Sequence, residues 1–285
     1  MKSLQNLIFM ALFLFSLTSC SKLIYISKTL EPEIILEKGR NDIVFVNLFD
    51  YTLPVYVKEK NEEAYNAGVR KLTDGLASSF SGDKSISFLV GDTLKKGTEV
   101  GTLSTLLPID SISAICARFN SNILLALDSM NIFFDWETIV DTDADGSKSK
   151  TKNFYLYTDY YFSLYSSEGD LINRSKKQRS IFYKSRPTLS GLITIQPSIA
   201  KAKDKIESLG LLAGEDYADK FYPQNVQEPR QIYYGKVFNE SNAYIDAGNW
   251  TKAIELLEKL AESSDPKIAK KARNNLDVAK EAAGM

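Results

Sequence analysis

The chain has 285 residues, and its 35 Lys and Arg against 36 Asp and Glu give a formal net charge of −1. This balance lacks the basic excess that marks a nucleic-acid-binding surface. The chain also contains no histidine, which excludes Ser-His-Asp triads, Cys-His dyads and histidine metal ligands. Catalysis would have to rely on carboxylates, Lys, Tyr or Ser, so we predict a protein that is not an enzyme and uses no cofactor.

The N-terminus has the pattern of an export signal. Met1 and Lys2 give a positive start, and residues 7–17 are almost wholly apolar. That length is typical of a signal peptide and too short for a membrane-spanning helix. The stretch ends in Leu17-Thr18-Ser19-Cys20, which resembles the lipobox of bacterial lipoproteins. The resemblance implies cleavage before Cys20 and a lipid anchor on that residue; an ordinary secretory signal with an incidental cysteine is the alternative.

The residues after the cysteine indicate where the anchored protein resides. Ser21-Lys22-Leu23-Ile24 contains no acidic residue, whereas an Asp directly after the cysteine favours the inner membrane in known lipoproteins. It also lacks the acidic tag that sends some lipoproteins to the cell surface. We therefore expect the outer membrane and its periplasmic face. In this view residues 1–19 are the signal peptide and residues 20–40 form a lipid-anchored tether.

Strand and helix patterns alternate through the next part of the chain. The apolar periodicities predict strands over residues 42–49, 86–90 and 123–134, and helices over residues 64–80 and 108–119. Two alternating segments, residues 154–165 and 171–183, then read as a hairpin. The order predicts an α+β fold with a mixed sheet and packed helices over residues 41–196. It resembles the small α/β domain of curli-secretion lipoproteins, penicillin-binding-protein activator lipoproteins and the Tol-system propeller protein.

Three candidate chemical sites lie in this predicted domain. Asp141, Asp143 and Asp145 alternate before Gly146 as in a calcium loop, but Lys152 occupies the place of the acidic twelfth ligand. A polar hairpin loop is the simpler interpretation, with a weak calcium site as the alternative. The lone Cys116, in an apolar stretch, is expected to be a buried structural thiol. The third candidate, a set of carboxylates for a glycan enzyme, consists of Asp128, Asp135 and Glu137.

Residues 197–285 are expected to be all helical. A helix over residues 198–209 is punctuated by Gly210 and Gly214. From about residue 228 to 285 the chain resembles a tetratricopeptide repeat, in which Tyr244, Gly248, Trp250, Ala253 and Leu257 occupy characteristic positions. Only about one and a half repeats are present, whereas such solenoids need about three to bury a continuous core. These helices should therefore pack against the preceding domain or against a partner.

The mature chain from residue 20 to 285 resembles an uncharacterised family of Bacteroidota lipoproteins that join such an α/β domain to tetratricopeptide-like helices. It has Asn225 and Val226 where a Trp would be expected after Pro223. Besides Cys20, the matching residues are Gly214, Tyr217, Ala218, Pro223, Arg230, Tyr233, Tyr234, Trp250 and Ala253.

These features predict a non-enzymatic adaptor or scaffold that binds another envelope protein. Arg230, Tyr233, Tyr234 and Trp250 are the expected partner contacts, because Arg, Tyr and Trp dominate interface hot spots; alternatively, they form the seam between two domains. An oligomeric structural or secretion component of the outer membrane is a second hypothesis. A carboxylate-dependent cell-wall or glycan enzyme is a third.

Overall fold

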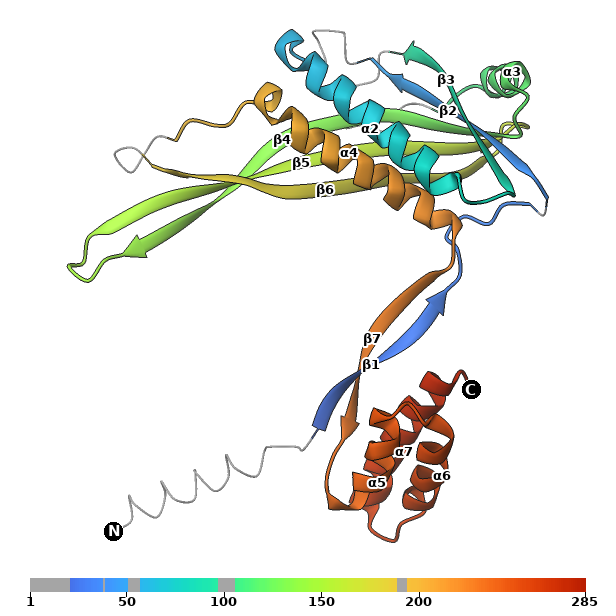
Figure 1. Ribbon diagram of the computed structural model, residues 1–285, viewed down its shortest axis with the longest axis vertical. Helices are drawn as coiled ribbons and strands as arrows, with labels where there is room; N and C mark the ends of the chain where they lie inside the picture. Colours follow the sequence, from blue (N-terminus) through green and yellow to red (C-terminus); the bar gives the residue numbers. More distant parts are fainter. Residues whose placement is uncertain (1–20, 38, 51–56, 97–105, 189–193) are drawn as a thin grey trace. The chain divides into compact units, whose positions relative to one another are not determined.

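Figure 1 shows a computed structural model of the chain, which describes residues 21–37, 39–50, 57–96, 106–188 and 194–285. The described chain separates into two compact units. Unit 1 combines the residues up to Glu31 with Gln224–Met285, and unit 2 spans Pro32–Pro223. Within the described ranges, no helix has both the length and the hydropathy to cross a membrane.

Unit 2 is built on a five-stranded mixed sheet in the order β3-β2-β4-β5-β6. β2 runs parallel to β3 and β4, whereas β5 and β6 continue the sheet antiparallel. The strands are β2 (Asn41–Phe49), β3 (Ile86–Lys96), β4 (Ile123–Thr142), β5 (Lys148–Ser166) and β6 (Leu171–Pro187). This confirms the predicted mixed α and β content, and β4 to β6 extend beyond the predicted segments.

Helices cover both faces of this sheet. Those of unit 2 are α2 (Glu62–Phe80), α3 (Ile109–Phe119) and α4 (Lys203–Ala218), with short 3₁₀ turns at Glu59–Asn61, Ile199–Ala202 and Asp219–Phe221. The side chains of α2 and α4 join the larger core on one face of the sheet, and those of α3 pack on the other. Cys116 of α3 is free and only 1% exposed, which confirms the expected buried thiol.

Glycines let α2 and α4 pack with their backbones nearly touching. A Cβ at Gly214 would lie 2.2 Å from the Leu72 carbonyl oxygen, and one at Gly210 would lie 2.4 Å from the Gly68 carbonyl oxygen. From the other helix, a Cβ at Gly75 would lie 2.3 Å from the backbone oxygen of Leu211. Gly210 and Gly214 therefore lie inside α4 and do not end a helix, because only glycine permits this approach to α2.

Unit 1 joins a two-stranded ribbon to three helices. β1 (Ser21–Leu30) pairs antiparallel with β7 (Gln224–Tyr233). The helices α5 (Asn239–Asp246), α6 (Trp250–Ala261) and α7 (Pro266–Ala283) follow a 3₁₀ turn at Lys236–Phe238. Ile26 of β1 and Ile232 of β7 are buried in one apolar cluster with the helices. The ribbon thus supplies the cover that this short helical set needs.

Two expectations for the ends of the chain differ from the structure. The expected tether of residues 20–40 contains β1, a strand paired along its whole length with β7. The expected all-helical region of residues 197–285 contains β7, and its first helix, α4, packs on α2 in unit 2. β7 lacks an apolar strand signal because most of its side chains are polar and half-buried or exposed.

Candidate functional site

The predicted anchor, Cys20, lies outside the described residues. The next residue, Ser21, already belongs to β1 and is in register with Tyr233 of β7. The Gln231 side chain donates a hydrogen bond to the Ser21 hydroxyl at 2.7 Å. The first residue after the predicted lipid is therefore held by the fold of unit 1.

Arg230 of β7 lies against α7. Its Nε and Nη2 donate hydrogen bonds of 2.8 Å and 2.6 Å to the two carboxylate oxygens of Glu281, a bidentate geometry. This contact raises the pKa of Arg230 and lowers that of Glu281. Arg230 also pairs with Glu228 on its own strand. The guanidinium thus fastens the ribbon to the last helix.

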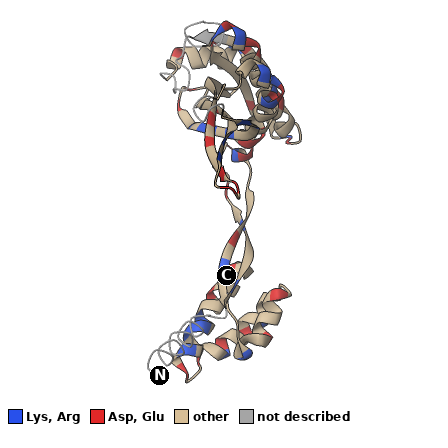
Figure 2. Cartoon of the chain, turned by 90° about the vertical axis from the view of Figure 1, so that its left-hand side faces the viewer, with Lys and Arg blue, Asp and Glu red and all other residues tan. Residues whose placement is uncertain are grey.

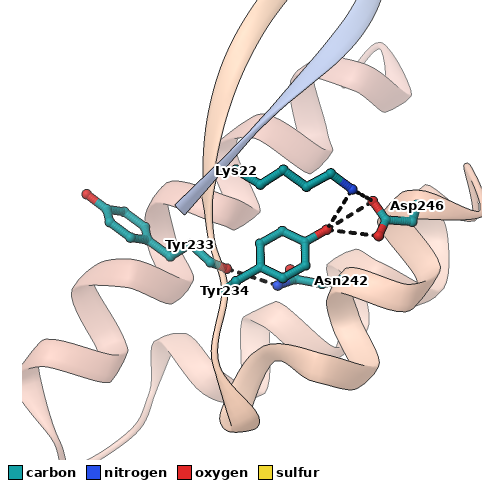
Figure 3. A network of polar contacts seen from close by, with 5 residues as sticks. All are labelled: Lys22, Tyr233, Tyr234, Asn242 and Asp246. Atoms are coloured by element: carbon teal, nitrogen blue, oxygen red, sulfur yellow. Dashed lines mark hydrogen bonds and ion pairs between the residues drawn. The ribbon is translucent and has the colours of Figure 1, made fainter. Parts of the chain in front are cut away.

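Tyr234 belongs to a network that joins β1 to α5 (Figure 3). Its hydroxyl donates to Asp246 Oδ2 at 2.9 Å, and Lys22 Nζ donates to Asp246 Oδ1 at 3.0 Å and to the Tyr234 hydroxyl at 3.3 Å. Burial alone would raise the pKa of Asp246, but the hydrogen bonds from Lys22 and Tyr234 outweigh it, and the net shift is downward. The hydrogen bond to Asp246 raises the pKa of Lys22.

The backbone of Tyr233 is clamped by two buried asparagines. Its N–H donates to Asn275 Oδ1 at 2.7 Å, and its carbonyl accepts from Asn275 Nδ2 at 2.8 Å. The same carbonyl also accepts from Asn242 Nδ2 at 3.0 Å (Figure 3). Asn242 and Asn275 are almost fully buried on α5 and α7. Sequence reasoning missed both, although an Asn inside an otherwise apolar helix stripe is a signal for such a role.

Trp250, the fourth predicted contact residue, begins α6 and is half-buried against the apolar cluster of unit 1. The structure brings Arg230, Tyr233 and Tyr234 together as the seam between the ribbon and the helices, within one unit. Partner binding by these four residues stays a prediction, and the contacts described above give them a role in holding unit 1 together.

The candidate calcium loop forms the turn between β4 and β5. Its backbone closes through Asp143 N to Ser147 O at 2.9 Å. Ser147 also bonds to the carboxylates of Asp143 and Asp145. These two aspartates and Asp141 are exposed. Among the residues with described positions, no group of three or more Asp, Glu, Cys or His gathers in a way that could hold a metal ion.

The three candidate catalytic carboxylates occupy unlike environments. Asp128 is fully buried and accepts a 2.6 Å hydrogen bond from Ser163. Asp135 is exposed seven residues along the same strand, about 23 Å away, whereas glycosidase carboxylates lie within about 10 Å of each other. The Tyr155 hydroxyl bonds to Glu137 at 2.6 Å and lowers its pKa, the opposite of what a general acid requires.

The end of the β4–β5 hairpin projects beyond α2 and α4 (Figure 1). We call residues 135–153 the arm. All eight residues of Asp135–Thr142 are exposed, so neither face of this part of β4 is covered. Yet Trp136, Ile139 and Val140 are large apolar side chains with 47%, 42% and 50% of their surface accessible. Sequence reasoning did not single out these residues, because their exposure depends on how far the hairpin outruns the helices.

Aromatic side chains continue from the arm along the sheet. Tyr155 and Phe182 form an edge-to-face pair with ring centroids 5.8 Å apart, and Phe133 stacks on Tyr157 at 5.2 Å. Half of the Phe182 surface is exposed on the edge strand β6. Lys152 Nζ lies 4.6 Å from the centroid of the Trp136 ring, within cation–π range. The sheet next to the arm therefore presents aromatic side chains, and Trp136 of the arm has a charged group beside it.

Comparisons with known proteins identify a family. A search among curated proteins finds no match. A solved structure described as a neuraminyllactose-binding hemagglutinin homolog from Helicobacter pylori aligns over 65% of this chain and 89% of its own, at 14% identity and a TM-score of 0.30. A family profile described as "Domain of unknown function (DUF8603)" matches residues 45–233. Because that match spans more than half of the sequence, the chain belongs to the DUF8603 family.

Proposed function

We propose that this protein is a lipid-anchored lipoprotein on the periplasmic face of the outer membrane, and that it acts as a non-enzymatic adaptor. Acylated Cys20 holds it to the membrane, and the arm of unit 2 binds another envelope protein. The helices α5 to α7 act as a tetratricopeptide-like support for the ribbon. The lipobox-like sequence supports the anchor, and the arm supports the adaptor role.

The exposed apolar surface of the arm is the observation that carries this proposal. Trp136, Ile139 and Val140 lie within five residues of one strand, and no helix of the described chain covers them. Trp136 and Val140 share one face of the strand, and Ile139 lies on the other. Large apolar side chains exposed together on a soluble domain mark interaction sites. Tryptophan is enriched among the residues that dominate binding energy, and the arm contributes Trp136. A hairpin fixed at its base by β6 presents them with little conformational entropy to lose.

Site-specific photo-cross-linking in the native bacterium tests the adaptor role. A photoreactive amino acid at Val140 should give one dominant adduct, with a different envelope protein, identified by mass spectrometry. The matched control is the same amino acid at Lys84, an exposed residue between α2 and β3 of the same unit. The expected result is an adduct at residue 140 and none at 84. Equal labelling at both positions, or no adduct at either, would overturn the adaptor proposal.

An adduct between two copies of this chain would instead favour the oligomeric structural component. The combined variant Trp136→Ala and Val140→Ser should reduce the dominant adduct, probed from Thr138 on the same face of the strand, at least tenfold. Unchanged circular dichroism would show that the variant is folded.

Cys20→Ser tests the anchor separately, because it should move the protein from the membrane fraction to the soluble fraction. A Cys20→Ser protein that stays in the membrane fraction would refute the lipid anchor.

A further inference from the structure

One end of unit 1 carries four basic side chains without a carboxylate partner. They lie in the first half of α7: Lys267, Lys270, Lys271 and Arg273. That helix has no acidic residue between Pro266 and Leu276. Among the described residues, none of the four forms an ion pair with a carboxylate. Elsewhere in unit 1, Lys22 pairs with Asp246, and Lys280 pairs with Glu258. Figure 2 shows Lys and Arg in blue and Asp and Glu in red along the chain.

The direction of α7 places this basic end beside the start of β1. Arg230 of β7 contacts Glu281, and Tyr233 contacts Asn275, so α7 runs antiparallel to β7. Lys271 lies one turn beyond Asn275, about 6 Å further along the helix axis. Its Nζ lies 5.2 Å from the centroid of the Tyr233 ring.

The register of the ribbon fixes where the predicted lipid leaves unit 1. Ser21 is opposite Tyr233, and β1 is antiparallel to β7. β1 and α7 therefore both run antiparallel to β7, and their first residues lie toward the same end of unit 1. Cys20 is bonded directly to Ser21, only about 3.8 Å away from Cα to Cα. The anchor and the unpaired basic residues consequently share one end of unit 1.

From this placement we infer that the first half of α7 is a membrane-contacting surface that binds anionic phospholipid headgroups. The inference rests on the proposed anchor at Cys20, since acylation there keeps this end of unit 1 close to the bilayer surface. Phosphate headgroups are the anions available at that distance. Electrostatic attraction acts over a Debye length of about 8 Å at physiological ionic strength. Together the lipid and the lysines fix the orientation of unit 1 on the membrane.

A spin label near the N-terminus of α7 tests this surface in the acylated full-length protein. Ser264→Cys places the label at an exposed residue before α7, and Ala283→Cys places the matched control label at its other end. Each labelled protein is reconstituted in vesicles of phosphatidylcholine with one third phosphatidylglycerol, or of phosphatidylcholine alone. Collision with a headgroup-bound nickel relaxant reports proximity to the bilayer surface. Cys116 is buried and remains unlabelled.

The label at residue 264 should approach the headgroups in vesicles with phosphatidylglycerol and move away in 1 M salt, where the Debye length falls to about 3 Å. The label at residue 283 should respond to neither. Each lysine near an anionic surface shifts such an equilibrium about fivefold, so replacing Lys267, Lys270 and Lys271 by Gln should reduce the contacting population roughly 100-fold. All three side chains are at least partly exposed, so the fold should tolerate this variant.

Two failures are distinguishable in this experiment. If mass spectrometry finds Cys20 without acyl chains, or the protein does not float with the vesicles, the proposed anchor is wrong. If the acylated protein floats with the vesicles but the residue 264 label ignores phosphatidylglycerol, or matches the label at 283, the headgroup surface is refuted and the anchor stands.

Discussion

Replacing Gly214 by alanine tests the close packing of α2 on α4. The new Cβ would lie 2.2 Å from the Leu72 carbonyl oxygen and 2.9 Å from the Leu76 backbone nitrogen. Both are backbone atoms of α2, so a rotamer change cannot relieve the clash. The two helices would have to separate by about 1 Å to restore an ordinary contact distance.

Two opposing effects set the magnitude. An interior Gly→Ala change favours a helix by about 1 kcal/mol, whereas overpacking a core costs about 1–3 kcal/mol. Leu72 and Leu76 are fully buried and would shift with the backbone of α2. With an overpacking cost of about 2 kcal/mol, we expect a net loss of about 1 kcal/mol in the free energy of unfolding of unit 2. Gly75→Ala makes the equivalent clash with Leu211. A single separation of α2 from α4 would relieve both clashes. The double variant should therefore lose less unfolding free energy than the sum of the losses of the two single variants.

Urea unfolding provides the assay. The chain has two tryptophans, and a Trp250→Phe background leaves Trp136 as the fluorescence reporter in unit 2. Gly82→Ala is the control, because no atom lies within 4 Å of the position of its Cβ; it should be neutral or slightly stabilising. If Gly214→Ala is as stable as the Trp250→Phe parent or more stable, helix propensity dominates and the backbone contact between α2 and α4 is refuted.

Three further predictions concern the seam of unit 1 and the buried thiol. Asn275→Ala removes two of the three hydrogen bonds to the Tyr233 backbone and should destabilise unit 1 by about 2 kcal/mol. Urea unfolding followed by Trp250 fluorescence in a Trp136→Phe background measures this loss, and no change would exclude the clamp. The folded pKa of Asp246 is below its ordinary value of 3.8, so its contribution is present at neutral pH and is lost as the pH falls below that value. Lys22→Met should reduce this acid sensitivity slightly, because solvent screens a half-exposed pair. Acid titrations that match the wild type would contradict the network. Burial raises the pKa of Cys116, so a thiol reagent at pH 8 should modify it only after unfolding; rapid reaction in the native protein would refute its burial.

The sequence predicted most of the central sheet because those segments carry their own signal. β2 is nearly continuous in apolar residues, and the apolar positions of α2 recur every four residues, so neither needs a distant partner to be recognised. The length of β4 was underestimated, because its distal half, Asp135–Thr142, breaks the period of two at the consecutive apolar residues Ile139 and Val140. The arm, which carries the proposed interaction surface, is therefore the part of the sheet that periodicity describes least well.

The seam could be predicted only as a set of residue types. Arg230, Tyr233 and Tyr234 stood out as potential contacts, but their partners Glu281, Asn275 and Asp246 lie elsewhere in the sequence and have no local motif. β1 and β7 are likewise defined by each other: Lys22 pairs with Ile232 across 210 positions. Because β1 and β7 are so far apart in the sequence, their pairing cannot be recognised locally, and each strand alone has the pattern of an irregular polar segment.

The route of the chain has a consequence for the order of folding. Unit 2 is an insertion between the two strands of the ribbon, and Thr29 and Asn225, which are hydrogen-bonded, are 196 residues apart. Near the base of unit 2, the Ile34 N–H donates to the Lys220 carbonyl at 2.9 Å. Once unit 2 has folded, the loop that the ribbon must close shrinks to roughly ten residues, which lowers its closure entropy by about 3 kcal/mol. Unit 1 should therefore form after unit 2. β1, which follows the predicted lipid anchor, should stay unpaired until β7 can pair with it.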